Sequence, residues 1–83
     1  MNLTEYKETY LDILASELSQ EEKECALDLL ASEIESCVWS FVAKSRAKLM
    51  VEEIRNMQNQ FPNGGLDALD SLAKKGMLVL KNV

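Results

Sequence analysis

The sequence predicts an all-α protein, a small bundle of three or four helices in one domain over residues 1–83, with a short apolar extension at the C-terminus. Three observations predict this class. Apolar residues recur at three- and four-residue spacing, the period of one helix face. Two segments have the form of a helix-capping box. A cluster of proline, asparagine and glycine within residues 61–65 marks a loop between helices.

The first helix is predicted over residues 3–18. Asn2 is its expected cap and Glu5 the residue that reaches back to the cap. Its apolar face consists of Leu3, Tyr6, Tyr10, Ile13, Leu14 and Leu18.

The second helix is predicted to begin near Gln20, with Ser19 as cap and Glu22 as its partner in a second capping box. Acidic residues in this first turn suit the positive end of the helix dipole. The expected apolar face consists of Ala26, Leu29, Leu30, Ile34, Cys37, Val38 and Phe41. The short link at Ser19 predicts that the first two helices form a hairpin.

A change in the direction of the apolar stripe predicts a break within residues 43–48. The face that ends at Phe41 points one way, whereas the following set lies on nearly the opposite side of the same ideal helix. That set is Ala47, Met50, Ile54, Met57 and Phe61. A break, with Ser45 as the candidate cap of a third helix over 46–60, would let both faces share one core. The alternative is an uninterrupted helix of about 40 residues, near 60 Å long, which would need a dimer to cover it.

A fourth helix is predicted over residues 66–75. Asp67 and Asp70 lie in its first half and two lysines at its end, matching the helix dipole at both poles. Gly76 is the expected left-handed residue after the helix, with Met77 contacting Leu72. The apolar extension 77–83 is a candidate short strand, and we expect the bundle, a second chain or a partner to cover it.

The composition argues against catalysis and metal binding. The chain has no histidine, so the common catalytic triads are excluded, and it has neither a phosphate-binding loop nor a CxxC motif. We therefore expect a protein that is not an enzyme and has no cofactor. Cys25 and Cys37 are expected to be free thiols, because twelve residues of one helix would place them about 18 Å apart. Without a signal-peptide pattern or a long apolar run, we expect a cytoplasmic location.

The charge is divided between the two halves of the chain. Up to residue 43 there are ten acids and two bases, whereas from residue 44 onward there are four acids and seven bases. Glu21, Glu24, Asp28 and Glu35 therefore predict an acidic surface on the first two helices, suited to a partner with a basic surface. The alternative is that these acids only solvate the helices.

Two further features are candidate interaction sites. Trp39 is expected on the far side of the second helix, either covered by the bundle or acting as an interface anchor. The bases Lys44, Arg46 and Lys48 form a cluster in the sequence. They could contact the acidic face of a second copy, or Lys44 could compensate a helix C-terminus. Direct nucleic-acid binding is not expected, because the chain is acidic overall and the cluster has no interleaved aromatic residue.

These features favour a non-enzymatic module that binds another protein and modulates or inhibits it. Nucleic-acid-binding proteins are among the candidate partners. Small acidic helical inhibitors encoded by phages offer an analogy at the level of the class. The alternative is a homo-oligomeric assembly protein whose dimer interface buries Trp39 and the C-terminal extension. A third alternative is a DNA-binding regulator that acts through residues 44–48.

Overall fold

The computed structural model describes residues 2–76, which form four α-helices and, within that range, no strand. The helices are α1 (Leu3–Ala15), α2 (Gln20–Ser36), α3 (Phe41–Gln58) and α4 (Gly65–Lys74). The predicted all-α bundle of three or four helices is confirmed, and the number of helices in the described residues is four. The expected Met77 contact and the apolar extension 77–83 lie outside the described residues.

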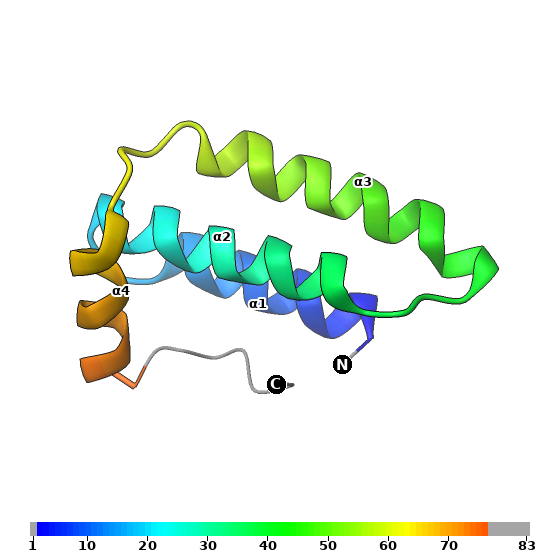
Figure 1. Ribbon diagram of the computed structural model, residues 1–83, viewed down its shortest axis with the longest axis horizontal. Coiled ribbons are helices and arrows are strands. Elements are labelled where there is room, and N and C mark those ends of the chain that lie inside the picture. Colours follow the sequence, from blue (N-terminus) through cyan, green and yellow to red (C-terminus); the bar gives the residue numbers. More distant parts are fainter. Residues whose placement is uncertain (1, 77–83) are drawn as a thin grey trace.

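The helix α2 is the centre of the arrangement, because it packs against α1, α3 and α4. Figure 1 shows α1, α2 and α3 running lengthwise and α4 crossing one end of the bundle. The link between α2 and α3 lies at the opposite end from α4. The helix α2 is therefore the only one of the four that packs against all three others.

Both predicted capping boxes are present. The Asn2 side chain accepts a hydrogen bond from the Glu5 backbone, and the Glu5 carboxylate accepts one from the Asn2 backbone, both at 2.9 Å. Ser19 and Glu22 repeat the pattern at the start of α2. The first helix ends at Ala15 rather than at residue 18. Its end is set by Ser16, which turns to extended backbone while its hydroxyl donates to the Ile13 carbonyl at 2.6 Å.

The break between the second and third helices exists, but its predicted position was wrong. Residues 43–48 lie inside α3, and the chain leaves helical geometry at Cys37, Val38 and Trp39. The indole N–H of Trp39 donates to the Ile34 carbonyl at 2.9 Å, which satisfies a carbonyl in the last turn of α2. The hydroxyl of Ser40, rather than that of Ser45, accepts from a backbone N–H of the new helix. Trp39 therefore belongs to the link and not to the far side of α2.

This earlier break changes the place of Lys44. It lies in the first half of α3, with its backbone N–H bonded to the Ser40 carbonyl, and not at the C-terminus of a helix. The proposed compensation of a helix C-terminus by Lys44 was therefore wrong. At the other end of the chain, Gly76 has a φ of +67° and its N–H donates to the Ala73 carbonyl, as expected for the residue that ends a helix.

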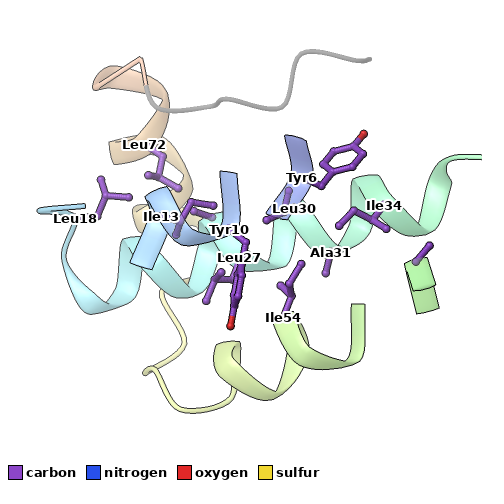
Figure 2. Close-up of a cluster of buried hydrophobic side chains, with 12 residues drawn as sticks. Tyr6, Tyr10, Ile13, Leu18, Leu27, Leu30, Ala31, Ile34, Ile54 and Leu72 are labelled. Carbon is purple, nitrogen blue, oxygen red and sulfur yellow. The ribbon is translucent and has the colours of Figure 1, made fainter. Parts of the chain in front are cut away.

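The core consists of apolar side chains gathered around α2 (Figure 2). Its largest fully buried members are Tyr6, Leu27, Leu30, Ile34, Ile54 and Leu72. Two residues expected on the buried face of the second helix, Val38 and Phe41, are instead exposed to solvent. They lie beyond the end of α2, so the helical spacing that placed them on its face does not apply to them.

The contact between α2 and α4 is close enough to require a glycine. A Cβ atom at Gly64 would lie 2.5 Å from the Ala68 Cβ and would also overlap the carbonyl of Glu21. The backbone before α4 can approach the start of α2 only because this side chain is absent.

Candidate protein-binding site

Two acidic side chains of α2 reach across to α3 while staying about half exposed to solvent. Asp28 and Glu35 both form ion pairs with Arg55 of α3, the second at 2.8 Å. The guanidinium also donates to the hydroxyl of Ser32. Hydrogen bonding to Glu35, followed by the contact with Asp28, raises the pKa of Arg55. Two of the four predicted acidic site residues thus join two helices of the bundle.

A third predicted residue, Glu24, has a similar internal role. One of its carboxylate oxygens accepts from the side-chain amide of Gln58 at 2.7 Å, and the other accepts from the backbone N–H of Gly64 at 2.9 Å. Glu24 therefore links α2 to the end of α3 and to the loop before α4. Of the four acids, only Glu21 is exposed and forms no side-chain hydrogen bond or ion pair within residues 2–76.

The neighbouring carboxylate of Glu22 is buried and connects α2 to α4. Besides capping α2, it accepts from Lys75 Nζ at 2.8 Å and from the hydroxyl of Ser71 at 2.5 Å. The hydrogen bond from Lys75, then those from Ser71 and Ser19, lower the pKa of Glu22 to about 2. The sequence indicated the cap, but the contacts with residues about fifty positions away could not be read from spacing.

Trp39 is partly buried and contacts Tyr6 of α1. Its ring meets that of Tyr6 edge to face, with centroids 6.0 Å apart. The Tyr6 hydroxyl in turn lies 3.4 Å from the sulfur of Cys37. The aromatic pair and the indole hydrogen bond to Ile34 hold the link between α2 and α3 in one conformation.

Three large apolar side chains project into solvent at this link. Val38 is 100% exposed, Phe41 is 95% exposed and Val42 is 73% exposed. We call these three residues the turn patch. Single exposed apolar residues are normal on a protein surface, but a contiguous group is typical of an interaction site. The sequence carried a signal for it: once Ser40 is taken as a cap, Phe41 and Val42 fall on the side of α3 opposite Ala47 and Ile54.

A groove of about 490 Å³ runs beside the turn patch, between the end of α2 and the first half of α3. We call it the α2–α3 groove. Its apolar lining includes Cys37, Val38, Trp39, Ala47 and Val51, and its charged lining is Glu35, Lys44 and Lys48. Three of the predicted site residues, Trp39, Lys44 and Lys48, are thereby brought together, along with Glu35.

The predicted basic cluster is divided between two sides of α3. Lys44 and Lys48 line the α2–α3 groove, whereas Arg46 lies toward α1, near Lys7 and Met50. None of the three clustered bases forms an ion pair within residues 2–76, although Lys7, Arg55, Lys74 and Lys75 each do. Among the described residues, the first half of α3 therefore carries a group of bases that form no ion pair.

Neither a metal site nor a reactive thiol is evident in the described part of the chain. No group of three or more acidic or cysteine side chains is placed to hold a metal ion among residues 2–76. Both cysteines are free. Burial, reinforced by Glu24 and Asp28, raises the pKa of Cys25, so this thiol is protonated at neutral pH. Across the same residues, no helix combines the length and apolar character needed to cross a membrane.

No protein-family model matches the chain, and comparisons with curated proteins and with solved structures found no significant match.

Proposed function

We propose that the protein is a non-enzymatic module that binds another protein through the turn patch and the adjoining α2–α3 groove. The observation that carries this proposal is the exposure of Val38, Phe41 and Val42 in one place on the surface. Removing an apolar side chain from water is favourable by about 1.5–3 kcal/mol, so a partner that covers this patch gains binding energy. By binding there, the module would modulate or block the partner.

The location of this surface differs from the acidic face that the sequence favoured. Glu24, Asp28 and Glu35 already satisfy hydrogen bonds or charges inside the bundle. A partner that bound them would compete with Arg55 or Gln58 for the same carboxylates, whereas the turn patch involves no such competition. The support for protein binding therefore comes from the apolar surface and from Trp39 beside it.

The test is quantitative affinity capture from extracts of the native host, using the full chain as bait. We compare the wild type with the double variant Val38→Ser/Phe41→Ser. Both side chains are exposed, so we expect the variant to keep the wild-type stability and to lose captured partners at least about tenfold, a change of about 1.4 kcal/mol. The matched control is Leu66→Ser, which alters an exposed leucine on α4 at the other end of the bundle. Equal capture by the patch variant and the wild type would reject the proposal.

A second candidate is a homo-oligomeric assembly protein, favoured by the same exposed patch. Two copies related by a two-fold axis could bury Val38, Phe41 and Val42 against one another. Size-exclusion chromatography with light scattering tests this directly. A dimer that becomes monomeric in the Val38→Ser/Phe41→Ser variant would support the second candidate, and a wild-type monomer at high concentration would reject it.

A further inference from the structure

From the charge and shape of the α2–α3 groove, we infer that its occupant is an acidic amphipathic helix of a partner protein. The inference rests on the proposed function and specifies the chemistry of the partner. The groove has an apolar lining from Trp39, Ala47 and Val51, while two lysines, Lys44 and Lys48, provide its charge on the α3 side. An occupant therefore needs an apolar face with negative charge beside it.

The two lysines are arranged unfavourably unless an anion lies between them. Lys44 and Lys48 are four residues apart on one helix, a spacing at which like charges repel by a few tenths of a kcal/mol. Both are exposed, and neither forms an ion pair within residues 2–76. From Phe41 to Val51, α3 has three bases and no acid. The one carboxylate that lines the groove, Glu35, is already paired with Arg55 at 2.8 Å and forms no ion pair with either lysine.

The stretch of α3 that lines the groove, from Lys44 to Val51, spans about two helical turns. From Lys44 to Val51, α3 advances about 10 Å, the same rise that separates positions i and i+7 of a partner helix. Apolar side chains at i, i+3, i+4 and i+7 would enter the groove, as in other helix-in-groove complexes. Acidic residues four positions apart on the partner would match the spacing of the two lysines.

A second copy of this chain does not supply such a helix from its described residues. The acidic helices α1, α2 and α4 each have their apolar face in the core, through residues such as Tyr10, Leu30 and Leu72. The remaining segment 77–83 contains one base and no acid in its sequence, so its charge does not complement that of the groove. A helix from a different protein fits better.

The test uses two capped synthetic peptides of about 14 residues, long enough to reach helical conformation on binding. Both carry leucine at helical spacing, one with glutamate and the other with lysine at the remaining positions. Binding to the full-length protein is followed by the fluorescence of Trp39, the only tryptophan, which lines the groove. We expect the acidic peptide to bind at least about tenfold more tightly than the basic one, and salt to weaken it.

Charge-reversal variants locate the binding. Lys44→Glu/Lys48→Glu should abolish the preference for the acidic peptide. Arg46→Glu/Lys74→Glu changes the net charge equally but alters no residue that lines the groove, so it should retain the preference. Unchanged preference in the groove variant would overturn the inference, as would the absence of binding by both peptides or stronger binding of anionic vesicles than of the acidic peptide.

The failure of this inference and the failure of the proposed function give different results. A stronger response to the basic peptide, with capture still dependent on Val38 and Phe41, would overturn the acidic partner alone. Capture that is indifferent to Val38 and Phe41 would reject the proposed function, whatever the peptides do.

Discussion

Glu22 shows how much one side chain can contribute to this small bundle. Its carboxylate caps α2 and accepts hydrogen bonds from Lys75 and Ser71 of the α4 region. A buried carboxylate is stable in a protein interior only when such partners satisfy its charge. The same residue therefore secures the beginning of one helix and the end of another.

This arrangement predicts a pH dependence. The folded-state pKa of Glu22, about 2, lies below its ordinary value of 4.5, so the unfolded state binds more protons between these two values. The stabilisation from Glu22 is fully present above about pH 4.5 and is lost as the pH falls toward 2. In Glu22→Gln, we expect lower stability than wild type at pH 7, with the difference shrinking over this range. Urea denaturation at several pH values measures it.

The control for this prediction is Glu21→Gln. The Glu21 carboxylate is exposed and forms no hydrogen bond or ion pair in the described chain. The unfolding free energy of Glu21→Gln should therefore vary with pH in the same way as that of the wild type. A constant difference between Glu22→Gln and the wild type at every pH would contradict the assigned role of the charge.

At the scale of the elements, the position of the break between α2 and α3 can be tested through two serines. Ser40 caps α3, and its replacement by alanine should cost about 1 kcal/mol of unfolding free energy. Ser45 is an exposed residue inside α3, where alanine is the better helix former, so Ser45→Ala should be neutral or slightly stabilising. Chemical denaturation of both variants measures the two changes in unfolding free energy. A larger cost for Ser45→Ala than for Ser40→Ala would place the break within residues 43–48.

The interface between α2 and α3 gives a second prediction at this scale. Arg55→Met retains the apolar part of the side chain but leaves Asp28 and Glu35 without their cation. Because both acids are about half exposed, we expect a loss of only about 1 kcal/mol, and less in about 1 M salt. Urea denaturation at low and high salt measures the loss.

The control for Arg55 is Lys7→Met, which removes a pair with Glu53 that spans 3.9 Å between exposed ends. Its effect should stay within about 0.5 kcal/mol. If the two variants lost the same unfolding free energy, the contacts of Arg55 with α2 would stabilise the protein no more than the exposed pair of Lys7 does.

The starts of α1 and α2 could be predicted from sequence because a capping box depends on residues three positions apart. The break was misplaced because Cys37, Val38 and Phe41 continue the spacing of the α2 stripe, and periodicity assumes that such residues are buried. The Ser40 cap gave little warning, since the residue at its third helical position is Ala43 and not an acid. Spacing alone does not reveal a patch that violates the rule used to find helices.

The candidate site was harder to predict for a related reason. The acids of α2 bind Arg55, Gln58 and Lys75, which lie on or beside other helices. These pairings depend on how the helices pack, and local sequence patterns carry no information about packing. Trp39, Lys44 and Lys48 were identified from their residue types, but their common groove exists only because the link turns α3 back along α2.

At the scale of the whole molecule, the packing of α2 against all three other helices predicts that the bundle unfolds as one cooperative unit. A domain of 83 residues has a total stability of roughly 4–12 kcal/mol. Leu30 is fully buried in α2, so Leu30→Ala should cost about 2–5 kcal/mol and leave a marginal fold. We expect far-ultraviolet circular dichroism and the fluorescence of Trp39 to report the same single transition for both the variant and the wild type.

The control for this prediction is Leu66→Ala, at a leucine that is 81% exposed and should cost little. Separate transitions for the two probes would show that the helices unfold independently.

The central place of α2 has a consequence for the newly made chain. On the ribosome α2 is completed before either α3 or α4, and the 38 residues that follow Ser36, up to Lys74, take about 2–8 seconds to synthesise. During that interval Leu27, Leu30 and Ile34 have only α1 to cover them. Nascent chains arrested with α2 but not α3 outside the ribosome exit tunnel should therefore attract chaperones that recognise apolar segments, and chains arrested with residues up to 76 outside the tunnel should release them.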